Sequence, residues 1–252
     1  MIKKFKIDFP AFTGTEKRKV YVYLPESYDT NKRKKYPVLY MFDGHNVFYD
    51  KDASYGRAWR LGKYLDSHKT QLIVVAVECH RGGHGQRELE YSPYRIGFRK
   101  DKKYDGCGDE TIKWFINVLK NRIDSEYRTL SNRENTFIMG SSMGGIMTTY
   151  AILKYNSIFS RGCSLSPAYF IYPEEILQTI KECKIKKDTT LYTDYGTKDL
   201  KGKNGIKAFN DINNALLEKN INITSRIVYE GIHRESTWEK QLDFAINTLL
   251  YE

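Results

Sequence analysis

A serine between two glycines is the residue of this sequence best suited to nucleophilic chemistry. The stretch Gly140-Ser141-Ser142-Met143-Gly144 fits the pattern G-x-S-x-G, follows the apolar run at 136–139 and precedes a helical pattern at 143–151. A sharp strand-to-helix turn of this kind exposes the serine hydroxyl, and glycines two residues to either side avoid clashes with neighbouring backbone. We predict Ser142 as the nucleophile; Ser141 is the rival, but it lacks the symmetric glycines.

A serine hydroxyl becomes a useful nucleophile when a base removes its proton and an acid orients that base. Where the nucleophilic serine lies in a strand–turn–helix, the catalytic residues follow one another along the chain in the order serine, acid, histidine. Of the 5 histidines only His233 follows Ser142. The acid we prefer is Asp199, in the loop after the strand-like segment LYTDY, with Asp194 inside or at the end of that strand as the alternative. Asp188 precedes the strand and is expected at its wrong end.

Two backbone N–H groups are needed to stabilise the oxyanion that forms during attack on a carbonyl. One is expected from Met143, the residue after the nucleophile. The other is expected from the loop Asp43-Gly44-His45-Asn46 after an apolar strand; we prefer the amide of His45 and place Gly44 second. These residues together predict acyl transfer through an acyl-enzyme, which needs neither a metal ion nor an organic cofactor.

Alternating strand and helix patterns predict the framework that positions these side chains. Segments 2–9 and 18–24 alternate in polarity and are typical of an antiparallel pair. Continuous apolar runs are typical of strands covered on both faces, as in a parallel sheet. Strand patterns of the parallel part occur at residues 38–42, 71–77, 136–139, 161–165, 189–193 and 221–229.

Helical patterns separate these strands, at residues 112–123 with Asp109 as a candidate cap, and at 143–151, 174–184, 208–216 and 236–250. Strand and helix alternate to the end of the chain, so we predict one α/β domain, residues 1–252, with a mostly parallel, doubly wound sheet and an antiparallel N-terminal edge. Residues 78–110 break the pattern and are expected to be a long functional loop without regular structure.

The composition excludes several other classes of protein. Hydrophobic residues are 40% and charged residues 29% of the 252, as in ordinary globular domains. Neither a leader-like apolar segment nor a membrane-length apolar run is visible, so we expect a cytoplasmic protein without a membrane partner. The net charge of +10 is spread over polar faces without a nucleic-acid motif, so no nucleic-acid partner is expected. The sequence is compatible with a monomer and with a homo-oligomer.

Taken together, these motifs resemble the putative-esterase family of α/β-hydrolases, which is related to siderophore (enterochelin) esterases, feruloyl and acetylxylan esterases and S-formylglutathione hydrolase. The resemblance runs from about Tyr21 to Trp238. It is carried by VLYMFDGHNVF, RELEYSPYR, SEYRTLSNRENTFIMGSSMGG, FSRGCSLSPAYF, DYGTKD and GIHRESTWEKQL. It implies an α/β-hydrolase fold with Ser142, Asp199 and His233 as the catalytic residues.

The same resemblance implies a small-molecule or carbohydrate ester as substrate, with a small acyl, sugar-linked or siderophore-type group. Tyr91 matches a family segment near the active-site rim, where it either contacts substrate or anchors the loop. Tyr169 and Phe170 follow another strand and are candidates to contact an acyl group or sugar, with packing in the core as their alternative role. The alternative function is that of an inactive α/β-hydrolase-fold protein that binds or scaffolds.

Overall fold

The structure is a computed structural model that describes residues 1–251 other than 12, 84, 100 and 101. Its contacts gather in two compact units, Met1–Thr136 and Phe137–Glu252, and each unit is described by itself.

Unit 1 contains four strands that lie side by side in the order β1-β2-β4-β3. Its strands are β1 (Ile2–Ala11), β2 (Gly14–Tyr23), β3 (Val38–Met41) and β4 (Ile73–Val77). β1 and β2 pair antiparallel, with Ile2 opposite Tyr23, and β2 also runs antiparallel to β4. β3 and β4 are parallel and fully buried, which is why their sequences are continuously apolar. The predicted antiparallel N-terminal edge is therefore confirmed.

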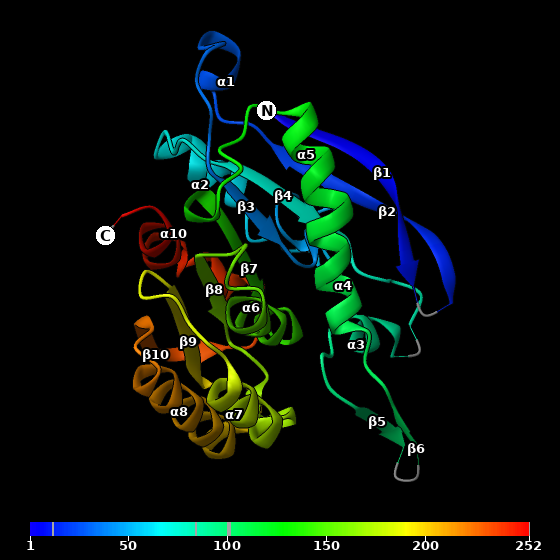
Figure 1. Cartoon of the computed structure of the whole chain (residues 1–252), viewed down its shortest axis with the longest axis vertical. Helices are drawn as coiled ribbons and strands as arrows, with labels where there is room; N and C mark the ends of the chain where they lie inside the picture. Colours follow the sequence, from blue (N-terminus) through cyan, green and yellow to red (C-terminus); the bar gives the residue numbers. More distant parts are fainter. Residues whose placement is uncertain (12, 84, 100–101, 252) are drawn as a thin grey trace. The chain divides into compact units, whose positions relative to one another are not determined.

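Most helices of unit 1 are short. The exception is a continuous helical rod along the sheet, residues 108–126, which begins with α4 (Gly108–Trp114) and is drawn in green in Figure 1. The rod's α-helical part α4 packs against β1, and the indole Nε1 of Trp114 donates to the Asp8 carbonyl at 2.9 Å. The predicted cap at Asp109 is wrong, because the helix begins earlier, with Cys107 at the N-cap and no side-chain cap. The helical segments are α1 (Ser27–Thr30), η1 (Gly44–Asn46), α2 (Leu61–Ser67), α3 (Gln86–Glu90), α4 (Gly108–Trp114), the π-helical η2 (Phe115–Lys120), α5 (Asn121–Glu126) and η3 (Arg133–Asn135).

The sequence suggested that the segment 78–110 has no regular structure, and this prediction is wrong. The segment contains α3 and a small hairpin of β5 (Ile96–Arg99) and β6 (Lys102–Tyr104). Its short elements have too few residues to show a helical or strand period in the sequence.

Unit 2 contains the strands β7 (Thr136–Ser141), β8 (Arg161–Leu165), β9 (Thr190–Lys198) and β10 (Asn222–Ile232), side by side in that order. All neighbouring pairs are parallel. β9 runs five residues beyond the predicted end at Thr193, so Asp194 lies within the strand and Asp199 directly after it.

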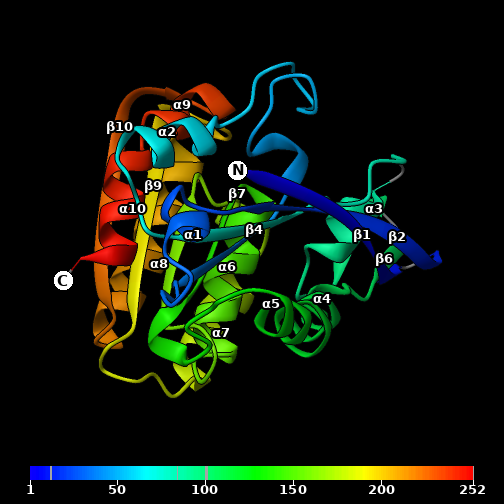
Figure 2. The same cartoon turned by 90° about the horizontal axis from the view of Figure 1, so that it is seen from above.

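Helices cover both faces of the sheet of unit 2. Neighbouring residues of a strand point to opposite faces. Ser225 of β10 contacts Asn213 of α8 (Gly202–Glu218), whereas Arg226 contacts Gln241 and Phe244 at α10 (Leu242–Leu250). The helices α8 and α10 therefore lie on opposite faces (Figure 1 and Figure 2). The helical segments are α6 (Met143–Lys154), η4 (Tyr169–Ile171), α7 (Pro173–Glu182), α8 (Gly202–Glu218), α9 (Glu235–Glu239) and α10 (Leu242–Leu250).

Parallel strands bring their carboxyl ends to one edge of a sheet, and that edge is where open α/β sheets bind ligands. In unit 2 the residues that directly follow β7, β8, β9 and β10 are Ser142, Ser166, Asp199 and His233. The fold thereby places a hydroxyl, a carboxylate and an imidazole at one edge. In the part of the chain that the structure describes, no helix is long and apolar enough to cross a membrane.

Candidate active site

Ser142 occupies the sharp turn between β7 and α6. Its backbone has φ 59° and ψ −120°, a strained conformation for a residue with a side chain. The turn is tight because a Cβ on Gly140 would lie 2.6 Å from main-chain atoms of Gly144. The Ser142 N–H donates to the Leu165 carbonyl at 3.0 Å, and its own carbonyl accepts from Ala168 at 3.2 Å. These bonds fix the strained turn to the loop that follows β8.

His233 and Asp199 form a direct pair. The Nδ1 atom of His233 lies 2.6 Å from Oδ1 of Asp199, whose side chain is fully buried. Burial alone would raise the pKa of Asp199, but the hydrogen bond and charge of His233 outweigh it and hold that pKa below its ordinary value. An ionised carboxylate only accepts hydrogen bonds, so Nδ1 carries the ring proton and Nε2 is left with a free lone pair that can accept a proton.

Asp194, the alternative acid, has other partners. Its Oδ1 accepts the Ser166 N–H at 3.0 Å and its Oδ2 accepts the Tyr192 hydroxyl at 2.9 Å. Burial raises the pKa of Asp194 to about 7. The carboxylate that faces His233 in this structure is therefore Asp199, and Asp194 lies inside β9 with both oxygens engaged.

The amide of Met143 is available at the start of α6. Ser142 is the N-cap, so Met143 is the first helical residue and its N–H has no partner inside the helix. The positive end of the helix dipole also lies there, which favours a developing negative charge. Met143 can thus act as the first oxyanion donor that the sequence predicts.

In unit 1, Gly44 and His45 open the 3₁₀ turn after β3. The turn begins from Asp43, which has a left-handed φ of 53°. A Cβ on Gly44 would lie 2.5 Å from the Ala76 carbonyl group, so β4 leaves room for glycine alone. As the first residues of the turn, Gly44 and His45 have amides without partners inside it. The His45 side chain is buried, with Nε2 2.9 Å from the Ser54 hydroxyl.

Two residues of the segment 78–110 fasten this turn. Arg87 forms a bidentate ion pair with Asp43, with N···O distances of 2.8 and 2.6 Å. The Tyr91 hydroxyl accepts the Asp43 N–H at 3.1 Å, and Tyr91 is 3% exposed. This burial favours the anchoring role of Tyr91 over a substrate contact. Sequence reasoning did not single out Arg87, although it begins the family-like stretch RELEYSPYR.

Among the described residues, Asp43, His45 and Cys79 form the one group of side chains whose types and spacing could hold a metal ion. Their donor atoms lie within 4.8 Å of one another. The guanidinium of Arg87 already neutralises Asp43, however, and a cation would be placed beside that positive charge. Burial also raises the pKa of the Cys79 thiol well above its ordinary value, which disfavours the thiolate that a metal needs. The chemistry of this group fits a structural role better than a metal site.

The aromatic residues after β8 differ in their surroundings. Tyr169 is fully buried, and its hydroxyl lies 2.6 Å from that of Thr149, which agrees with the alternative of packing in the core. Phe170 is partly exposed, with the Nζ of Lys201 5.9 Å from its ring centre. Phe170 is therefore the better placed of the two to meet a substrate.

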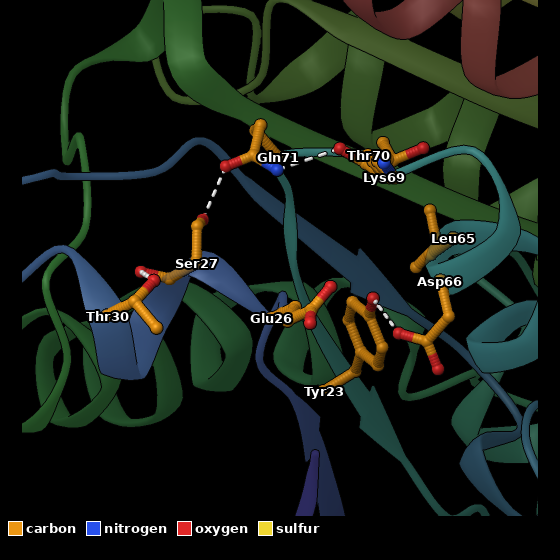
Figure 3. A pocket seen from close by; sticks show the side chains of 9 residues that line it. All are labelled: Tyr23, Glu26, Ser27, Thr30, Leu65, Asp66, Lys69, Thr70 and Gln71. Carbon is orange, nitrogen blue, oxygen red and sulfur yellow. Dashed lines mark hydrogen bonds between the residues drawn. The ribbon is translucent and has the colours of Figure 1, made fainter.

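A cavity of about 250 Å³ in unit 1 contains none of the predicted catalytic residues (Figure 3). Gln71 lines the cavity and directly precedes β4. The cavity therefore lies at the amino end of the parallel strands β3 and β4, away from the Gly44 turn at their carboxyl end. The Tyr23 hydroxyl donates to Asp66 across it at 2.7 Å. It is lined by Tyr23, Glu26, Ser27, Thr30, Leu65, Asp66, Lys69, Thr70 and Gln71.

Known proteins of similar sequence or structure match three quarters or more of the chain. An uncharacterized protein of Bacillus subtilis (strain 168), YbbA, is 24% identical over 193 residues, which are 75% of this chain and 72% of that protein. A ferulic acid esterase superposes with a TM-score of 0.73 at 17% identity, covering 98% of both chains. The enterobactin esterase FES from Shigella flexneri gives a TM-score of 0.71 at 15% identity, covering 98% of this chain and 59% of the other.

These structural likenesses, at low identity, establish the α/β-hydrolase fold. The family model described as putative esterase matches residues 13–249, which span both units of the structure. The chain therefore belongs to the putative esterase family and is a carboxylic-ester hydrolase of the α/β-hydrolase fold.

Proposed function

We propose that the chain is a serine esterase in which Ser142 is the nucleophile, His233 the base and Asp199 the acid. The observation that carries the proposal is the 2.6 Å contact between His233 and Asp199, in the same unit as the strained Ser142 turn. Strain of this kind is found where the surrounding structure enforces a functional geometry.

The reaction proceeds in two steps. The Nε2 atom of His233 takes the Ser142 proton as Oγ attacks the ester carbonyl, and the oxyanion accepts from the amide of Met143. The second donor remains the one expected from the sequence, the amide of His45, with Gly44 as the alternative. Collapse of the intermediate breaks the bond to the leaving alkoxide, which takes the proton from His233. A water molecule then gives a proton to His233 as its oxygen attacks the acyl carbonyl. The bond from that carbon to Ser142 Oγ breaks, Oγ takes the proton back from His233, and the carboxylic acid is released.

The proposed substrate is a small-molecule ester with a small acyl, sugar-linked or siderophore-type group. Support comes from the names of the structural relatives, a ferulic acid esterase and an enterobactin esterase. The partly exposed Phe170 beside Lys201 supplies an aromatic face with a cation near it, which suits an aromatic or anionic acyl group.

The test is hydrolysis of p-nitrophenyl acetate, butyrate and octanoate by the wild type, Ser142→Ala and His233→Ala. We expect both variants to lose at least about a thousandfold in kcat, because each removes a group used in every step. Ser157→Ala is the matched control, since Ser157 is exposed in the turn that follows α6. A fully active Ser142→Ala would contradict the proposal, and an inactive wild type would favour the binding role.

A further inference from the structure

Ser166 lies at the catalytic edge in an unusual backbone conformation. It follows β8, is 1% exposed, and has a left-handed φ of 42°. Its N–H donates to both the carbonyl and the Oδ1 of Asp194, each at 3.0 Å. A non-glycine residue in this region is strained and persists only where its neighbours fix it. Asp194 of β9 supplies that fixation.

The hydroxyl of Ser166 is oriented by Trp238. The indole Nε1 of Trp238 donates to the Ser166 Oγ at 2.8 Å. An indole N–H can only donate, so Oγ accepts here and the hydroxyl hydrogen of Ser166 must point elsewhere. The same indole ring packs edge-on against His233, with ring centres 5.2 Å apart and planes at 86°.

The carboxylate of Asp199 has one oxygen without a donor. Its Oδ1 is shared by His233 and the Leu200 N–H, both at 2.6 Å. Its Oδ2 is buried and, among the described residues, has no hydrogen-bond partner. Burial raises the pKa of Asp199, and the hydrogen bond and charge of His233 lower it. The Ser166 hydroxyl lowers this pKa further. A buried acceptor without a donor thus lies near a hydroxyl whose hydrogen has no assigned acceptor.

We propose that Ser166 is a positioning residue of the catalytic site: its hydroxyl, oriented by Trp238, donates to Oδ2 of Asp199 and keeps the carboxylate turned toward His233. A closed ring of contacts results, from Trp238 to Ser166 to Asp199 to His233 and back to the Trp238 ring. This inference rests on the proposed function, because it assigns Ser166 a role through the acid of that site.

The Ser166 hydroxyl also affects the pH profile of the enzyme. A second donor on Asp199 withdraws negative charge from the oxygen that faces His233. Without that donor the full carboxylate charge acts on the imidazole and favours its positively charged form. Loss of the Ser166 hydroxyl should therefore move the acid limb of kcat/KM to higher pH.

The experiment compares the pH profiles of kcat and kcat/KM for the wild type, Ser166→Ala and Ser166→Gly on p-nitrophenyl butyrate. For both variants we expect kcat to fall by about tenfold, KM to stay within about twofold, and the acid limb to rise by roughly half a pH unit. Ser166→Gly relieves the strain at φ 42°, so its Tm should be at least that of Ser166→Ala. Ser160→Ala, which removes another buried hydroxyl of unit 2, is the control and should leave the profile unchanged.

Trp238→Phe keeps an aromatic ring against His233 but removes the N–H donor. We expect it to shift the acid limb in the same direction and by less than Ser166→Ala. An acid limb at the wild-type pH in both Ser166 variants would overturn the inference, whatever happens to kcat or Tm. That result is distinct from failure of the proposed function, which an active Ser142→Ala would show.

Discussion

At the scale of single residues, two aspartates five positions apart in sequence, Asp194 and Asp199, have opposite surroundings. Asp199 faces His233 and is held ionised, whereas Asp194 is fully buried in β9 and burial raises its pKa to about 7. The sequence placed both carboxylates near the end of one strand. It could not decide between them from pattern alone, because the direction of a side chain at a strand end depends on where the strand stops.

The first residue-scale prediction compares Asp199→Asn with Asp194→Asn. Asp199→Asn should lower kcat by about 10⁴-fold with little change in KM, because an amide no longer fixes the tautomer and charge of His233. Asp194→Asn should lower kcat by less than about tenfold. Steady-state kinetics on one ester checks both. A larger loss in Asp194→Asn would identify Asp194 as the acid instead.

The second residue-scale prediction concerns the pH dependence of the stability of the folded chain. Because the folded pKa of Asp194 is raised to about 7 and an unfolded Asp titrates near about 4, the unfolded chain releases this proton first as pH rises. The stabilisation that protonated Asp194 gives the folded state is complete below about pH 4. It decreases as the pH rises from about 4 to about 7, by at most roughly 1.4 kcal/mol per pH unit.

Thermal unfolding of the wild type and Asp194→Asn between pH 4 and 7 measures this contribution. The asparagine has no proton to release, so the Tm of the variant should fall less steeply over that range. Parallel curves for the two proteins would contradict a raised pKa at Asp194.

At the scale of elements, strands with continuous apolar sequence were the most predictable part. β3, β4 and β7 were predicted from such runs, and all three are buried along their length. β9 extends past its predicted end because its last residues, Gly196 to Lys198, carry no apolar signal and still pair with β10. The segment 78–110 was misread because backbone pairing and the Asp43–Arg87 ion pair organise it, and neither leaves a periodic pattern.

The element-scale prediction concerns the turn between β7 and α6. Gly140→Ala puts a Cβ at 2.6 Å from main-chain atoms of Gly144, which cannot move aside as a side chain would. We expect a loss in Tm of roughly 2–12 °C and at least a hundredfold loss in kcat as the Ser142 turn is displaced.

Gly62→Ala is the matched control for that substitution. A Cβ on Gly62 in α2 would meet side chains of Ile2 and Phe48 at ordinary distances of 3.4 and 3.5 Å. Alanine also favours a helix over glycine by up to about 1 kcal/mol, so the Tm should stay the same or rise. Equal kcat for Gly140→Ala and the wild type would show that the turn tolerates the change.

At the scale of the whole molecule, chain order and the carboxyl edge of a parallel sheet led from the sequence to the proposed catalytic residues. Ser142 and His233 follow strands far apart in sequence, and the fold places them after β7 and β10 of one parallel sheet. Ser166 and Arg87 were not predicted, because each acts through a hydrogen bond or ion pair that exists only once the chain has folded.

The net charge of +10 belongs to the whole molecule as well. Such a charge attracts anionic substrates at low ionic strength without selecting a particular one. A cytoplasmic location, a single-domain organisation and the absence of a nucleic-acid partner stay predictions of the sequence.

The most direct measurement of the central claim is covalent labelling with a fluorophosphonate, followed by intact mass and peptide mapping. We predict one adduct per chain in the wild type, carried by Ser142, the same adduct in Ser141→Ala, and none in Ser142→Ala. An unlabelled wild type, or an adduct that persists in Ser142→Ala, would contradict Ser142 as the nucleophile of this esterase.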